Sequence, residues 1–344
     1  MRRALRTAFL LAFLGAAGAA AWLAWFAHAP LALPAAPYDF TVRPGERLKG
    51  LARELAAGGL LDGPAIPGAS TLEGEGFWIL GRLLGKAGAI RAGTYRLGEP
   101  LSPLALLDKL ARGDVLLVEA LFVEGTTFRQ WRSALETDAH VRHTLAGKSD
   151  AEVAALLGIP QPSPEGWLFP DTYRFTPGSS DEDILKRAHS AMAKRVAQAW
   201  SGRDPDLPLA TPYEALILAS IVEKETGLPA ERPLIASVFV NRIRLHMRLQ
   251  TDPTVIYGMG ERYDGNIRKR DLLADTPWNT YTRDGLPPTP IAMPGADALH
   301  AAVHPAASDF LYFVSRGDGS HEFSRTLEQH NRAVARYQLH AGSS

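Results

Sequence analysis

The chain has 344 residues, with 37 Lys+Arg against 37 Asp+Glu and no cysteine. Zero net charge argues against a protein that holds nucleic acid through a diffuse basic surface, so no nucleic-acid partner is expected. The lack of cysteine excludes disulfides, thiolate zinc sites, iron–sulfur clusters and cysteine nucleophiles. The length allows two folded domains and one further segment.

The further segment is an uncharged stretch near the N-terminus. It runs from Ala8 to Ala27, and as a helix it would span about 30 Å, the thickness of the hydrocarbon core of a membrane. Arg2, Arg3 and Arg6 precede it, which predicts a cytoplasmic N-terminus. The alternative is a cleaved signal peptide ending at residues 27–29, although the apolar run is longer than such peptides usually carry. Both interpretations place the rest of the chain outside the cytoplasm.

Beyond the apolar segment, the pattern of residues predicts an α+β protein. Alternating apolar residues at 38–42 and near 90–97 predict strands, and helical spacing predicts helices between and after them. A strand-like run at 116–122 precedes a region that is mainly helical. The predicted organisation is a cytoplasmic tail at 1–7, a transmembrane helix at 8–27, a linker at 28–37, a small α+β domain at 38–118 and a larger, mainly helical domain with β elements at 119–342.

One helix carries the strongest indication of chemistry. Thr211 to Glu214 form a capping box with proline at the first helical position. Residues 215–222 are apolar on all sides, so the helix is expected to be buried. It ends in Glu223-Lys224-Glu225, where the helix dipole and an apolar surrounding both disfavour a charged carboxylate. A carboxyl with a raised pKa is suited to general acid catalysis near neutral pH.

Glu223 and Glu225 point to opposite sides of this helix, so only one of them can face a given cleft. Glu223 shares its side with Ser220. The alternative is that both are ordinary helix-end charges or partners of Arg232 and Arg242.

The segments that follow are rich in short polar groups and prolines. Three stretches are expected to form rigid loops: a turn at 249–258, Trp278 to Tyr281, and the proline-rich stretch at 285–290. Hydroxyl, amide and aromatic groups on rigid loops are typical of carbohydrate recognition. The candidate substrate-binding residues are Ser220, Gln250, Thr251, Asp252, Thr254, Tyr257, Asn279 and Tyr281.

A pair of histidines, His300 and His304, has the spacing of two ligands on one helix face. The glutamate of a zinc-protease motif is missing, and Pro305 should end the helix. No metal site is therefore predicted.

Several long motifs resemble one family, the YceG-like (MltG-type) endolytic murein transglycosylases. They are EGWLFPDTY at 165–173, IVEKET at 221–226, NRIRLHMRLQTDPTVIYG at 241–258, WNTY at 278–281, GLPPTPIAMPG at 285–295 and HPAASDFLYFV at 304–314. The resemblance implies a membrane anchor, a LysM-like domain at 38–118 and a catalytic domain related to lytic transglycosylases. It assigns the catalytic acid to Glu223 and requires no cofactor. Met293 departs from the family, in which a polar residue is expected.

The implied reaction is non-hydrolytic cleavage of the MurNAc-β-1,4-GlcNAc bond of nascent strands, which leaves 1,6-anhydroMurNAc ends and limits strand length. It needs one carboxyl, whereas ordinary glycosidases use two. The implied location is the inner membrane, single-pass, with peptidoglycan synthases as candidate partners. Two alternatives stay open: a membrane-anchored peptidoglycan-binding protein without turnover, and a hydrolytic muramidase with Glu225, Asp252 or Asp171 as a second carboxylate.

Overall fold

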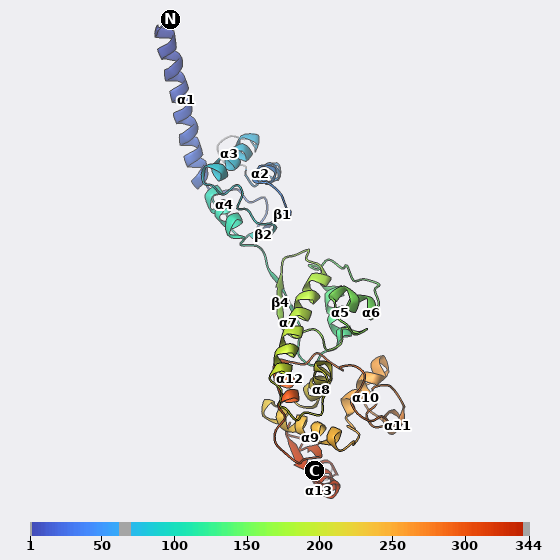
Figure 1. Cartoon of the computed structure of the whole chain (residues 1–344). Helices are drawn as coiled ribbons and strands as arrows, with labels where there is room; N and C mark the ends of the chain where they lie inside the picture. Colours follow the sequence, from blue (N-terminus) through green and yellow to red (C-terminus); the bar gives the residue numbers. More distant parts are fainter. Residues whose placement is uncertain (1, 62–69, 340–344) are drawn as a thin grey trace. The chain divides into compact units, whose positions relative to one another are not determined.

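The computed structural model describes residues 2–61 and 70–339. Three parts of the predictions lie outside the described residues: Met1, residues 62–69 of the predicted first domain, and the predicted end of the second domain at 342. The chain divides into two compact units. Unit 1 comprises Met1–Val118 with Phe175–Pro177, and unit 2 comprises Glu119–Arg174 with Gly178–Ser344 (Figure 1).

Helix α1 (Arg2–His28) contains the predicted apolar segment. Its residues Leu5–His28 form a candidate membrane span with a mean hydropathy of 1.9. The last turns of α1 pack on α3 and α4, where Phe26 is buried in the core of unit 1 and Trp22 packs against that core. The predicted linker at 28–37 also packs in part: Leu31 is buried, and its N–H donates to the carbonyl of Leu101 at 2.8 Å.

Among its described residues, unit 1 contains a two-stranded antiparallel sheet and three helices besides α1. In the sheet, Tyr38 lies opposite Leu97 and Val42 opposite Gly93. Buried apolar side chains of both strands and all the helices form one core. The elements are β1 (Tyr38–Val42), α2 (Leu48–Ala57), α3 (Ser70–Leu83), β2 (Gly93–Leu97) and α4 (Pro103–Arg112).

The first part of unit 2 confirms the mainly helical pattern and adds a strand. The EGWLFPDTY motif at 165–173 runs into β4 (Thr172–Phe175), which forms a two-stranded sheet with β3 (Val118–Leu121). Tyr173 and Phe175 are buried and alternate with exposed residues, as expected of a half-buried strand. The helices here are α5 (Phe128–Thr137), α6 (Asp150–Leu157) and α7 (Asp181–Ser201).

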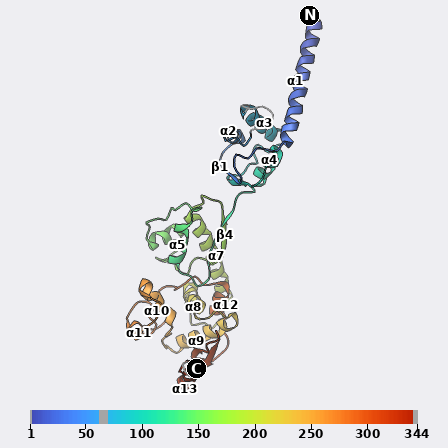
Figure 2. The same cartoon turned by 180° about the vertical axis from the view of Figure 1, so that it is seen from behind.

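Helix α8 (Pro212–Glu225) is the centre of unit 2, and α7, α9, α10 and α12 pack around it (Figures 1 and 2). The segment 249–258, expected to be a turn, is mostly helical, since α10 begins at Asp252 with proline in its first turn. The remaining elements are η1 (Pro229–Glu231), α9 (Arg232–Arg244), α10 (Asp252–Met259), η2 (Gly260–Arg262), α11 (Lys269–Leu273), α12 (Ala296–Val303), β5 (Tyr312–Ser315), β6 (His321–Ser324), α13 (Leu327–Val334) and η3 (Ala335–Leu339).

Candidate active site

The last turn of α8 is held rigidly by the rest of the helix. Thr211 caps the helix by accepting a hydrogen bond from the N–H of Glu214 at 3.2 Å, and every residue from 215 to 222 is buried. The chain turns to extended backbone at Thr226. Glu223 and Glu225 therefore leave the helix in fixed directions, and they meet different surroundings.

Glu223 is enclosed by α12 and α9. Its side chain is 7% exposed, and Oε2 accepts a hydrogen bond from the N–H of Gly295 at 2.9 Å. The Arg232 guanidinium lies 3.5 Å from Oε1 and also pairs with Asp297 at 3.3 Å. Burial raises the pKa of Glu223 above its ordinary value, and Gly295 and Arg232 act in the opposite direction. The negative charge of Glu124 adds to the rise, so this carboxyl has an N–H donor and a cation as partners and still a raised pKa.

Glu225 lies in the wall of a polar cavity of about 430 Å³. The hydroxyl of Thr251 donates to its Oε1. Burial raises the pKa of Glu225 to about 7, the negative charge of Asp252 adds to the rise, and Thr251 and Arg242 lower the pKa. Arg242 is fixed in this wall because it donates to the carbonyls of Leu249 and Leu311, both at 2.7 Å. A carboxyl with a pKa near 7 can donate a proton at neutral pH.

Four of the predicted substrate-binding residues line the same cavity as Glu225: Gln250, Thr251, Asp252 and Tyr281. The hydroxyl of Tyr281 donates to Oδ1 of Asp252 at 2.6 Å, which fixes both groups at the cavity wall. The cavity is also lined by Tyr312, His321 and His330, which the sequence analysis did not single out. They follow much later in the chain, and only Tyr312 lies in a quoted motif.

Three other predicted substrate-binding residues are buried and hold the fold together. Ser220 accepts from the N–H of Ile291 at 3.0 Å, and the hydroxyl of Thr254 donates to the carbonyl of Thr251 at 2.7 Å. Asn279 donates to the carbonyl of Ala274 at 2.7 Å. All three residues are 0% exposed. Their polar groups are used in hydrogen bonds within the protein, and contact of these three residues with a ligand stays a prediction.

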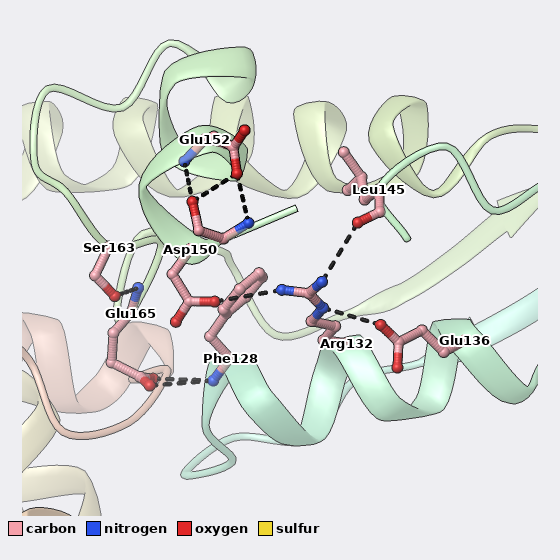
Figure 3. Close-up of polar contacts among 9 residues, drawn as sticks. Phe128, Arg132, Glu136, Leu145, Asp150, Glu152, Ser163 and Glu165 are labelled. Carbon is pink, nitrogen blue, oxygen red and sulfur yellow. Dashed lines mark hydrogen bonds and ion pairs between the residues drawn. The ribbon is translucent and has the colours of Figure 1, made fainter. Parts of the chain in front are cut away.

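Tyr257 lines a second, larger cavity of about 760 Å³ together with Trp278 and Glu165. Glu165 is buried, and it accepts a hydrogen bond from the N–H of Phe128 at 3.1 Å (Figure 3). It also accepts one from the hydroxyl of Tyr257 at 3.1 Å. Burial raises the pKa of Glu165 to about 8. The sequence analysis includes Glu165 only as part of the EGWLFPDTY motif. The neighbouring apolar residues Trp167, Leu168 and Phe169 were the sequence feature that could have indicated its burial.

Two residues that the sequence analysis weighed lie apart from these cavities. Met293 is buried, and its backbone pairs with that of Gly125 and Thr126, so its side chain belongs to the core. His304 has Asp204 as a partner at 2.8 Å. In the part of the chain that the structure describes, no three His, Asp or Glu side chains are grouped as metal ligands.

Comparison with known proteins gives one consistent result. The sequence profile of the YceG-like family matches residues 40–336. The chain is 34% identical over 271 residues to the endolytic murein transglycosylase of Bacillus subtilis, and the alignment covers 73% of this chain and 74% of that protein. It is 29% identical over 282 residues to the protein of the same name from Streptococcus pneumoniae, covering 72% of this chain and 51% of that protein.

The fold agrees with the sequence comparisons. The crystal structure of a YceG-like protein from Listeria monocytogenes is similar with a TM-score of 0.53 at 28% identity, and it covers 87% of this chain and 100% of the other. The family match extends over both units, and the motifs at 165–173, 221–226 and 241–258 fall inside the matched range. This chain therefore belongs to the YceG-like family.

Proposed function

We propose that this chain is an endolytic murein transglycosylase, a lyase that cleaves the MurNAc-β-1,4-GlcNAc bond and leaves a 1,6-anhydroMurNAc end. The names of its relatives support the reaction. The single observation that carries the proposal is the cavity in which Glu225, with a pKa raised to about 7, lies beside four polar residues predicted to bind sugar.

We take Glu225 as the acid in this proposal, and the assignment of the acid to Glu223, which the family resemblance implies, stays a prediction. Glu223 is paired with Arg232 and Gly295 and lines neither of the two cavities described above. An acid must lie within hydrogen-bond reach of the oxygen that it protonates. Glu225 lines one of these cavities, whereas the carboxylate of Glu223 is paired with Arg232.

The reaction proceeds in two proton transfers through one carboxyl. Protonated Glu225 donates its proton to the glycosidic oxygen as the bond from this oxygen to C1 of MurNAc breaks. The resulting carboxylate then accepts the proton of the MurNAc 6-hydroxyl while that oxygen bonds to C1, so Glu225 ends protonated again and no water is consumed. The neighbouring carboxylate of Asp252 would stabilise the positive charge that develops at C1.

The two units suggest how the enzyme reaches its substrate. The order β1–α2–α3–β2 with paired antiparallel strands supports a LysM-like domain in unit 1. Helix α1 would anchor the chain in the inner membrane, with its arginines in the cytoplasm and the rest outside. Tethering raises the concentration of the active site near newly made glycan. Cleavage of nascent strands beside their synthase would then limit strand length.

Mass analysis of the products tests the reaction. Full-length chain in detergent is incubated with purified peptidoglycan, and the new ends are analysed, since anhydro and reducing ends differ by one water. Anhydro ends support the proposal. Reducing ends would make the chain a muramidase with Asp252 as second carboxylate, and bound but uncut glycan would make it a binding protein.

The topology has its own test. Protease added to spheroplasts should digest everything beyond residue 38 and leave only a short membrane-protected fragment. A full-length protected chain, or a soluble chain without α1, would contradict the anchored orientation.

A further inference from the structure

The part of α1 that is free to enter a membrane is shorter than the candidate span. From Trp22 onward, the last turns of α1 pack against the core of unit 1. Residues 7–21 before them are exposed and uncharged, and these roughly 15 residues make about 22 Å of helix. The hydrocarbon core of a membrane is about 30 Å thick. A bilayer that α1 crosses therefore extends past Trp22, to the part of unit 1 that packs there.

Helix α3 belongs to that part of unit 1, because it lies against the last turns of α1 (Figure 1). The two helices approach closely at Gly76. A Cβ atom at this position would lie 2.7 Å from the ring of Trp22 and 3.6 Å from the ring of Phe26. Glycine has no Cβ, which permits this close approach. Helix α3 is therefore at the level of α1 that the bilayer reaches.

Beside this contact, α3 presents a row of apolar side chains to solvent. Leu72, Ile79 and Leu83 are 61%, 40% and 72% exposed. On a helix they fall within about 40° of one another, and Gly76 is about 40° from Leu72. We call these three residues the α3 stripe. A contiguous exposed apolar row marks an interaction site, and this one adjoins the surface of α1.

The side of the α3 stripe that faces away from α1 is bordered by basic residues. Lys49 and Arg53 share one acid, Glu75, at 3.4 and 3.5 Å. Lys49 and Arg82 also lie over the ring of Trp78, at 4.3 and 5.3 Å from its centroid. Three cations around one acid suit anionic lipid headgroups. Apolar residues on one side of a helix and basic residues beside them are typical of a helix that lies in the plane of a membrane interface.

We propose that unit 1 docks on the membrane that α1 crosses, with the α3 stripe inserted at the boundary between headgroups and hydrocarbon. The bilayer is the partner because the short free part of α1 brings it to the level of α3, where the apolar surface continues. The basic border then meets the headgroups. The choice of partner rests on the proposed anchoring of α1. Docking fixes unit 1 against the bilayer, so α1 does not act as a free tether.

Quenching by labelled lipids tests the docking. The chain has no cysteine, so Leu83→Cys takes a single environment-sensitive fluorophore in the full-length chain, which is reconstituted in vesicles of phosphatidylethanolamine and phosphatidylglycerol. Lipids with a nitroxide near the headgroup should remove most of its fluorescence. Leu14→Cys, in the middle of the free part of α1, reports the anchor through nitroxides deep in the acyl chains. Leu117→Cys, an exposed leucine of unit 1 beyond α4, is the control and should not be quenched.

Charged substitutions separate docking from an effect of the label itself. Leu72→Glu with Ile79→Glu places two carboxylates in the α3 stripe of the labelled Leu83→Cys chain, so most of the quenching should disappear. Both side chains are exposed, so the fold should persist, which circular dichroism checks. Leu117→Glu in the same labelled chain is the matched control and should leave the quenching unchanged.

Other results would overturn the proposal. An unquenched label at position 83 beside a quenched label at position 14 would retain the anchor and reject the docking. A label at position 83 that emits as in an apolar surrounding, yet is not quenched by lipid, would place a protein such as a second copy of the chain on the α3 stripe. An unquenched label at position 14 would reject the anchoring, and the docking with it.

Discussion

Glu223 and Glu225 lie on one helix turn, yet their surroundings differ in kind. Glu223 meets a guanidinium and a backbone N–H and is closed in by α12, whereas Glu225 meets a hydroxyl and lies in a polar cavity. Burial raises the pKa of both carboxyls. The helix end and burial therefore explain the direction of the pKa shift, and the different partners of the two carboxyls are the basis on which we propose Glu225 as the acid.

Exchanging the two carboxyls for amides gives the largest expected effect. Glu225→Gln cannot protonate the leaving oxygen, so the rate of anhydro-end formation should fall about 10²–10⁴-fold. Glu223→Gln retains an acceptor for Gly295 and should keep most of the activity. Rates from labelled peptidoglycan measure both variants, and an inactive Glu223→Gln beside an active Glu225→Gln would reverse the assignment.

Removal of Arg232 should affect stability rather than catalysis. Arg232→Met leaves Glu223 buried without its cation, and breaking such a pair costs about 3 kcal/mol of unfolding free energy. Urea unfolding measures the loss, and the double variant Arg232→Met/Glu223→Gln should recover part of it. A large loss of activity at unchanged stability would instead place Arg232 and Glu223 in the catalytic site.

The buried carboxyl in the larger cavity should make stability depend on pH. The pKa of Glu165 rises from 4.5 to about 8 in the folded state. The unfolded chain therefore loses this proton first, and the unfolding free energy falls as pH rises from 4.5 to about 8, by at most ~1.4 kcal/mol per pH unit.

Glu225 adds a change of the same sign up to about pH 7. Glu165→Gln removes only the contribution of Glu165, so unfolding of this variant should weaken less with pH than that of the wild type. Glu261→Gln, an exposed acid, serves as the control. Parallel pH curves for wild type and Glu165→Gln would show that Glu165 is ionised in the folded protein.

The smallest expected effect concerns the hydroxyl that donates to the proposed acid. Thr251→Val removes a hydrogen bond that lowers the pKa of Glu225. The pKa should rise, and the alkaline limb of the pH–rate profile should move to higher pH by less than about one unit. Thr137→Val, on the exposed surface of α5, is the control. A limb that stays in place would mean that another group limits the reaction.

Much of the fold follows from local sequence. Helix α4 begins where Ser102 caps it, at 3.2 Å from the N–H of Ala105, and ends at Gly113 with a φ of +70°. Both residues are helix-end signals that can be recognised in the sequence. Helix α10 was missed, because its start at Asp252-Pro253 was interpreted as part of a turn. The burial of Leu31 depends on contact with Leu101, which is distant in the sequence.

The site was harder to predict because its selection depends on long-range partners. Ser220, Thr254 and Asn279 are polar residues in the right segments, but their hydrogen bonds are used within the protein. The opposite directions of Glu223 and Glu225 could be predicted from helix geometry. The sequence could not predict which of the two side chains lines a cavity, because this depends on residues distant in the chain. These are Arg232 beside Glu223 and Thr251 beside Glu225.

The most direct test of the assignment is a crystal structure of the Glu225→Gln chain with an N-acetylglucosamine oligomer. The account predicts a glycosidic oxygen at about 2.6–3.2 Å from the side-chain amide at position 225, with the sugar between Thr251 and Tyr281. An oligomer whose glycosidic oxygen contacts Glu223, with the ion pair to Arg232 opened, would contradict it.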